Sequence, residues 1–374
     1  MDFDLSDDQR MIKDSVERLI ADRYGFESRR ALMRNPEGWS REMWAQMAEL
    51  GLLGVAFDEA HGGFGGGPVE TMLIAEAFGR GLVVEPYFAT VVLGAGLIRR
   101  AGSADQQAAY LPQVASGELL LAFAHHERHA RNDLAHVAAT ATEQDGVWTI
   151  TGEKSLVLHG DTADKVIVSA RVAGETTDHN GIGLFVVDAV GLNRRGYATQ
   201  DGQRAAEIAF DATPAEAVLS LDGFPAIAAT VDAAIAFVCA EAVGGMAEMH
   251  SSTVDYMKTR KQFGRAIGEF QVLQHRAVDM FVNLEQSRSM ALYATMMAEE
   301  PDAAERARAI SSAKVAIGRN GRAVGQEAIQ LHGGIAMTME YKVGHYFKRM
   351  TMIEKLFGDT EHHLAKVAQA GGAL

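Results

Sequence analysis

A basic and aromatic segment near residue 260 has the residue types needed to hold a phosphate-bearing ligand. Arg260, Gln262 and Phe263 lie within four residues of one another, at the end of a predicted helix that starts near Ala226 and breaks at Gly264. Arginine offers a planar, permanently charged fork for pyrophosphate oxygens, and the phenylalanine ring offers a flat face for an aromatic part of the ligand. These residues alone also fit an ordinary solvated Arg–Lys pair beside a core Phe. A second segment is needed to distinguish a ligand site from such a surface.

That second segment is Gln330-Leu-His-Gly-Gly334. It places an amide and two glycines at the end of a predicted helix, where backbone N–H groups can approach a phosphate without a Cβ atom in the way. Alone, the segment also fits a simple helix C-cap. Together with Arg260–Gly264, it predicts a binding site for a diphosphate.

The two segments resemble the RxQFG and QxxGG motifs of the acyl-CoA dehydrogenases, flavoproteins that oxidise acyl-CoA thioesters to 2-enoyl-CoAs. The resemblance runs from Met1-Asp-Phe-Asp-Leu-Ser to the last predicted helix, and the chain also resembles the small subunit of two-component members such as pimeloyl-CoA dehydrogenase. The family's residues at these positions bind the adenine-diphosphate half of a neighbouring subunit's FAD. Here they are Arg260, Gln262, Phe263, Gln271, Gln330, Gly333 and Gly334.

The resemblance places the flavin ring against a β-rich part of the chain. Phe123 and His125 fall on the strand that meets the ring, and His126 stands where the family usually has Thr or Ser before Glu. Leu156 and Leu158 replace a Trp and a Thr that usually contact the ring. Backbone N–H groups must then stabilise the reduced flavin, which suits a chain that shares its site with a different partner subunit.

The implied reaction also needs a carboxylate that removes the α-proton while hydride leaves the β-carbon. The family's Tyr-Glu-Gly-Thr segment corresponds to Phe357-Gly-Asp-Thr360, so Gly358 stands at the base position and the carboxylate of Asp359 comes one residue later. Thr360 matches the Thr that contacts the flavin diphosphate region. Other members carry the base on the helix before RxQFG, at the position of Ala234 here.

Three interpretations of the base remain open. Glu241 can be the base, because it lies two turns after Ala234, about 10 Å further along the same helix face. Glu241 can instead be structural, paired with an arginine such as Arg276, with the base supplied by a partner subunit or absent. Asp359 can be a displaced base. The chain is therefore expected to be either a dehydrogenase subunit or a non-catalytic subunit that completes another chain's FAD site, and an oxidase would differ only in oxygen access.

Three regions position these residues, in an α+β fold of the acyl-CoA dehydrogenase type. Residues 1–117 have helical periodicity, beginning with a capping-box start at Ser6. Residues 118–223 hold short β-rich runs with turn signals such as Asp145-Gly146, which predict an antiparallel β-barrel or sandwich, and Gly152-Glu-Lys154 fits a turn at its rim. The predicted strands are Leu119–Ala124, Val147–Thr151, Lys165–Ala170, Ile182–Val187 and Ala206–Phe210. Residues 224–374 are rich in Ala, Met and Leu at helical spacing, which predicts a C-terminal four-helix bundle.

Composition narrows the setting and the partners. A net charge of −14 disfavours nucleic acid or an anionic membrane as partner. The single Cys239, the acidic N-terminus and the lack of an apolar run long enough for a membrane helix predict a cytoplasmic protein. The neighbouring His125, His126 and His129 lack a second ligand cluster, so no metal is expected.

The resemblance implies the remaining partners. These are an acyl-CoA substrate, an electron-transfer flavoprotein as electron acceptor, and other subunits in a homo- or hetero-oligomer built as a dimer of dimers.

Overall fold

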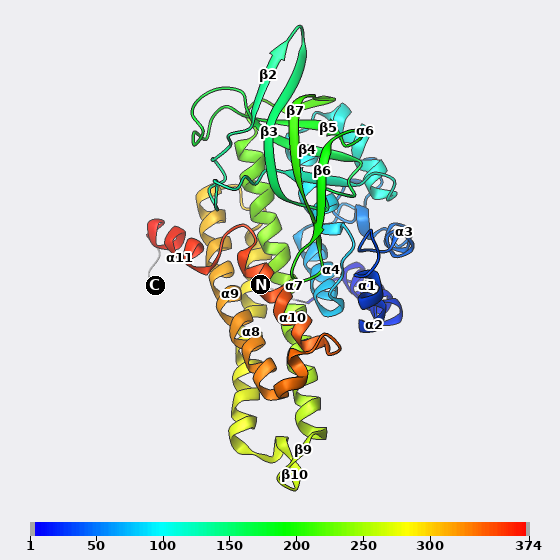
Figure 1. The fold of residues 1–374 in the computed structure, drawn as a ribbon, viewed down its shortest axis with the longest axis vertical. Coiled ribbons are helices and arrows are strands. Elements are labelled where there is room, and N and C mark those ends of the chain that lie inside the picture. The colour runs from blue at the N-terminus through cyan, green and yellow to red at the C-terminus, as the bar shows by residue number, and fades with distance from the viewer. Residues whose placement is uncertain (1–3, 372–374) are drawn as a thin grey trace. The chain divides into compact units, whose positions relative to one another are not determined.

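The computed structural model describes residues 4–371. Met1–Phe3 and Gly372–Leu374, at the outer ends of the predicted first and third regions, lie outside the described residues. A β-rich stretch lies between two helical stretches of the sequence, as Figure 1 shows. The chain divides into two compact units, one made of Met1–Arg30, Pro68–Val83 and Ile235–Leu374 and the other of Ala31–Gly67 and Val84–Ala234. These two units cut across the predicted regions, since residues 1–117 contribute to both units. The domain boundaries at 117 and 223 therefore stay a prediction.

The N-terminal helices begin where the sequence signals predict. The Ser6 hydroxyl accepts from the Gln9 N–H at 3.1 Å and the Gln9 side chain accepts from the Ser6 N–H at 3.0 Å, which is the predicted capping box. The helical elements of this part are α1 (Asp7–Arg23), α2 (Phe26–Leu32), α3 (Arg41–Glu49), η1 (Leu52–Gly54), η2 (Glu59–His61), α4 (Pro68–Gly81), the π-helical η3 (Phe88–Ala95), α5 (Gly96–Ala101) and α6 (Ala104–Ala115).

The central strands form a largely antiparallel sheet in the order β6-β7-β3-β2-β4-β5-β8, with β1 parallel to β4. Asp145 and Gly146 both have positive φ, 52° and 79°, as the predicted two-residue hairpin turn requires. The strands are β1 (Leu121–Ala124), β2 (Thr140–Gln144), β3 (Val147–Leu158), β4 (Lys165–Arg171), β5 (Ile182–Asp188), β6 (Asn193–Ala198), β7 (Arg204–Pro214) and β8 (Ala217–Ser220).

Strand β3 corrects one turn prediction. The sequence Gly152-Glu-Lys154 looks like a turn at the rim of the sheet, but it lies inside β3 and Lys154 is buried. The pairing of β3 with β7 is interrupted between Lys154 and Val157, and Leu156 has a positive φ of 49°. This bulge re-aims the side chains of the following residues.

The C-terminal part is helical as predicted, and Figure 1 shows α8 and α9 running alongside each other. Helix α7 corrects another expectation, because by length and composition it could cross a membrane. In its most apolar window, however, 72% of the residues are buried inside the protein, as in an ordinary core helix. The elements are α7 (Phe224–Thr259), β9 (Lys261–Gln262), β10 (Arg265–Ala266), η4 (Ile267–Glu269), α8 (Gln271–Met297), α9 (Ala303–His332), η5 (Gly333–Met337), α10 (Lys342–Lys355) and α11 (Thr360–Gln369).

Helices α4 and α7 pack at backbone distance. A Cβ atom at Gly79 would collide with the backbone carbonyl of Glu241, and one at Gly244 would collide with that of Glu76. Only glycine allows this approach, and it fixes the part of α7 that carries Glu241.

Candidate functional site

The Arg260–Gly264 segment forms a hairpin rather than the end of a helix. Helix α7 stops at Thr259, and the two residues of β9 pair with those of β10. Phe263 and Gly264 form the turn with φ of 54° and 81°, so the prediction that the helix continues to Gly264 is wrong. Figure 1 shows this hairpin at the end of α7 and α8. The turn leaves the Phe263 ring 92% exposed, while Arg260 forms no ion pair within residues 4–371.

A stack of aromatic rings joins this hairpin to the Gln330–Gly334 segment. Tyr256, one turn before Arg260, stacks on His332 with ring centroids 4.5 Å apart. His332 also contacts the hydroxyl of Tyr341 through Nε2 at 3.0 Å, and burial lowers its pKa, which keeps the ring neutral. The structure therefore brings the two predicted segments together. Sequence reasoning missed Tyr256 and His332, although an aromatic residue beside each motif was a visible signal.

The residues at this end of the helices fit the adenine-diphosphate half of FAD. Gly333 and Gly334 have open space where a Cβ atom would lie, so their backbone is accessible. Arg260, Gln262, Gln271 and Gln330 are all exposed, so their side chains are accessible to a ligand. A guanidinium, several amides and an exposed ring are the groups that bind phosphate oxygens and a purine.

In the sheet, His125 lies in the interior. Its ring stacks on Phe123 with centroids 5.2 Å apart, and its Nδ1 lies 2.8 Å from the Ser169 hydroxyl. Burial, with the nearby Lys154 cation, lowers the pKa of His125 to about 3. The ring is thus neutral and enclosed, and only the backbone of His125 remains for a cofactor contact.

His126 is oriented differently. The Ser155 N–H, in the β3 bulge, donates to the His126 carbonyl at 2.8 Å, so β1 and the Leu156–Leu158 segment lie together as predicted. The Nδ1 atom of His126 is buried and has no hydrogen-bond partner in the described chain. Burial lowers the pKa of His126, which favours a neutral imidazole. A buried polar atom without a partner fits a site that a ligand's polar ring edge completes, and the half-buried Leu156 and Leu158 offer apolar contact.

Beneath this segment lies a buried ion pair. The Lys154 ammonium donates to Glu127 Oε1 at 2.7 Å and to the His125 carbonyl at 3.2 Å. Glu127 also accepts from the N–H groups of Ala138 and Ala139. These bonds engage Glu127 in the fold, and across residues 4–371 no group of three or more His, Cys, Asp or Glu residues has a metal-binding arrangement.

Glu241 forms a two-pronged ion pair with Arg349 of α10. Arg349 Nε donates to Oε1 at 2.6 Å and Nη2 donates to Oε2 at 2.7 Å. Glu241 is only 4% exposed. The suggested partner Arg276 is wrong, because Arg276 pairs with Glu327 at 2.5 Å. With both oxygens of Glu241 engaged, the geometry favours the structural interpretation over the base.

Asp359 has a capping role. Its Oδ1 accepts from the His362 N–H at 3.0 Å at the start of α11, and its Oδ2 lies 3.2 Å from the Lys355 ammonium. The His362 N–H and then Lys355 lower the pKa of Asp359, which makes it a weaker proton acceptor. Gly358 and Ala234 carry no carboxylate. The geometry thus weighs against both predicted bases.

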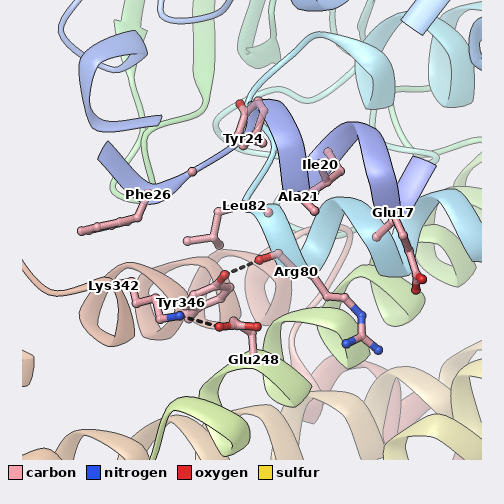
Figure 2. A pocket seen from close by; sticks show the side chains of 13 residues that line it. Glu17, Ile20, Ala21, Tyr24, Phe26, Arg80, Leu82, Glu248, Lys342 and Tyr346 are labelled. Atoms are coloured by element: carbon pink, nitrogen blue, oxygen red, sulfur yellow. Dashed lines mark hydrogen bonds and ion pairs between the residues drawn. The ribbon is translucent and has the colours of Figure 1, made fainter. Parts of the chain in front are cut away.

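A cavity of about 430 Å³ lies within the first unit, and no predicted site residue is among the residues that line it (Figure 2). Side chains of α1, α4, α7 and α10 line it. Lys342 pairs with Glu248 at 2.5 Å, and the Tyr346 hydroxyl donates to the Arg80 carbonyl. Both cations of the lining have acidic partners, Lys342 with Glu248 and Arg80 with Glu76, so the cavity has no strong bias toward an anionic ligand.

Comparison with known proteins identifies the family. Models of the acyl-CoA dehydrogenase N-terminal, middle and C-terminal domains match residues 6–118, 122–213 and 222–372. The acyl-CoA dehydrogenase FadE12 of Mycobacterium bovis is 30% identical over 361 residues, which cover 90% of this chain and 89% of the relative. These matches confirm the predicted fold class.

Two solved structures have the same fold over nearly the whole chain. The Tcur3481-Tcur3483 steroid ACAD has a TM-score of 0.88 at 29% identity and covers 97% of each chain. PigA with FAD and proline has a TM-score of 0.88 at 27% identity, with 99% of this chain and 98% of that chain covered. The chain belongs to the acyl-CoA dehydrogenase family, whose members are FAD-dependent oxidoreductases.

Proposed function

We propose that this chain is a subunit of an assembly that oxidises an acyl-CoA thioester to the 2-enoyl-CoA. The observation that carries the proposal is the exposed set around Arg260 and Phe263, joined to Gly333 and Gly334 through the Tyr256–His332 stack. When bound, FAD supplies the acceptor for the β-hydride. Arg260 would neutralise diphosphate charge and Phe263 would cover the adenine, while Phe123, His126, Leu156 and Leu158 would line the ring.

An oligomer follows from the exposure of these residues. A phenylalanine that is 92% exposed at a hairpin turn is unusual for a finished surface and suits a contact with another subunit. We infer a homo- or heterotetramer in which this hairpin reaches the FAD of a neighbour. The buried unpaired Cys239 suits a reducing, cytoplasmic setting.

A second candidate role is a subunit that completes another chain's FAD site and supplies no base. The observation that favours it is the engagement of both candidate carboxylates, Glu241 with Arg349 and Asp359 with the His362 N–H and Lys355. In that case the α-proton would be removed by a carboxylate of a partner chain.

The acyl group and the electron acceptor are further proposals. Resemblance to the small subunit of pimeloyl-CoA dehydrogenase suggests a dicarboxylyl-CoA, and similarity to a steroid ACAD suggests a steroid side chain. An electron-transfer flavoprotein is the proposed acceptor, and direct reaction with oxygen would instead make the protein an oxidase.

The test is a visible spectrum of the chain purified alone, followed by anaerobic addition of acyl-CoAs that include pimeloyl-CoA and a steroid-side-chain CoA. Bound flavin that bleaches with one of them supports a self-contained dehydrogenase. Flavin that appears only on co-expression with a second acyl-CoA dehydrogenase chain supports the second role. A chain that holds no flavin alone or with such a partner contradicts both.

A further inference from the structure

Lys314 of α9 is buried beneath the loop that corresponds to the family's base-bearing segment. It is 1% exposed, and its ammonium donates to the carbonyls of Ile353, Glu354 and Gly358 at 2.6, 3.1 and 3.1 Å. A lysine ammonium has three N–H donors, and all three are used. Two of the acceptors belong to the last turn of α10, whose carbonyls lack partners within the helix.

The loop itself has a backbone that needs to be held. Phe357 has a φ of 58° and Gly358 a φ of 113°, and a positive φ is costly for a residue with a side chain. Such a conformation persists only where the surrounding structure holds it. The hydrogen bond from the Lys314 ammonium to the Gly358 carbonyl is one of the contacts that hold this backbone conformation.

Two more residues of the same α9 face contact the same loop and the helix after it. The Ser311 hydroxyl lies 3.1 Å from His363 Nδ1, and His363 Nε2 lies 3.1 Å from the Phe357 carbonyl. At Gly318 a Cβ atom would collide with the Thr360 hydroxyl. Residues 311, 314 and 318 recur at helical spacing, so one face of α9 holds residues 357–363.

We propose that Lys314 is a positioning residue that fixes the loop Phe357–Thr360 in the conformation that binds FAD. The inference rests on the proposed function and on the family resemblance, which matches Thr360 to a Thr that contacts the flavin diphosphate region. Removing the ammonium leaves three buried carbonyls without a donor, and the loop must then rearrange to satisfy them. In this proposal Lys314 does not touch FAD and acts only through the loop.

The test compares Lys314→Met with Arg306→Met. Arg306 is also a buried cation of α9, and it donates to a backbone carbonyl, that of Glu300, at 2.7 Å, well before the loop-contacting face. Both variants lose thermal stability. We expect Lys314→Met to weaken FAD binding about tenfold or more, measured by fluorescence titration of the flavin-free protein, whereas Arg306→Met stays within about twofold.

Hydrogen exchange of residues 355–363 gives a second readout without FAD. Lys314→Met should speed exchange there selectively, and Arg306→Met should not. If Lys314→Met does not fold, Lys314→Gln, which has two N–H donors instead of three and no charge, replaces it in both measurements. Gly318→Ala keeps the ammonium but displaces Thr360, so it tests separately whether the position of Thr360 matters for FAD binding. If FAD binds only to a complex with a partner chain, the titration uses that complex.

The possible outcomes distinguish failure of the proposed function from failure of the role assigned to Lys314. Wild-type protein without FAD affinity, alone or in a complex, refutes the proposed function, while loop exchange still tests the hold by Lys314. Wild-type affinity and wild-type loop exchange in folded Lys314→Met overturn the inference. So does an equal loss of affinity in Arg306→Met at equal thermal stability, because the effect would then be general destabilisation.

Discussion

Replacing Glu241 by Gln distinguishes a structural role from a catalytic one. In the structure, the Glu241 carboxylate accepts from Nε and Nη2 of Arg349, and both side chains are buried. Gln can keep only one acceptor toward the guanidinium and carries no charge. The variant therefore deprives the buried cation of Arg349 of the charge of Glu241.

The expected cost follows from that burial. Removing one partner of a buried ion pair costs about 3–5 kcal/mol, mainly because the remaining charge stays out of water. With a urea dependence of about 3 kcal/mol per molar for a chain of this size, the unfolding midpoint of Glu241→Gln should fall by about 1–1.7 M. Arg349→Met should fall by a similar amount.

A double-mutant cycle isolates the pair. The cycle compares the single variants Glu241→Leu and Arg349→Met with the double variant that carries both. The double variant replaces both charges by apolar side chains and should regain most of the stability lost in either single variant, because buried ion pairs are close to neutral against well-packed apolar residues. The coupling free energy between the two sites should be about 3 kcal/mol. Urea unfolding followed by tryptophan fluorescence measures it, with Arg276→Met as the control that removes a half-buried ion pair on a more accessible part of the bundle.

The catalytic alternative gives the opposite pattern. Loss of a general base slows proton removal by about 10²–10⁴-fold. If Glu241→Gln keeps its flavin and its urea midpoint yet no longer bleaches with an acyl-CoA that bleaches the wild type, the structural reasoning is refuted and Glu241 is the base.

Three further outcomes are expected. Phe263→Ala should change the stability of the separate chain by less than about 0.5 kcal/mol, because the ring is 92% exposed, but should lower flavin content and oligomer mass in sedimentation velocity. His126→Thr restores the family's hydroxyl and should shift the visible spectrum of bound flavin; an unchanged spectrum would argue against contact with the ring. Burial would raise the pKa of Glu76, but Arg288 and then Arg80 outweigh it, so the pKa is lowered below 4.5. This stabilisation is present above pH 4.5 and is lost as pH falls through the lowered value, so Glu76→Gln should flatten the loss of stability in acid, as measured by thermal unfolding across pH 3–6.

Local signals predicted local structure well. The Ser6 capping box and the Asp145-Gly146 turn depend on residues a few positions apart, so their geometry is written in the neighbouring sequence. Strands β2 and β6 were not predicted, because both are polar and mostly exposed and lack the apolar alternation of a half-buried strand. The hairpin after Thr259 was read as helix because Phe263 adopts a positive φ that its residue type does not suggest.

Contacts between residues far apart in the sequence could not be predicted from local patterns. Arg349 follows Glu241 by 108 residues, and the nearer Arg276 was an equally plausible partner by residue type. Lys314 presented the same difficulty, since a lysine in a helix is usually solvated. What buries it is the meeting of α9 with the end of α10, a contact no local pattern encodes.

The segment around Thr360 is held by several contacts from one face of α9. Lys314, Ser311 and Gly318 make these contacts, although Gly358, at the family's base position, carries no carboxylate. A loop maintained in a strained conformation without a base is explained if its task is to bind FAD rather than to remove a proton. In the proposed assembly, a second chain would cover Phe263, which is 92% exposed, and the exposed Arg260 beside it. Co-expression with a chain that carries the base should therefore raise flavin retention and protect Phe263 from solvent together, and a gain in one without the other would separate FAD binding from assembly.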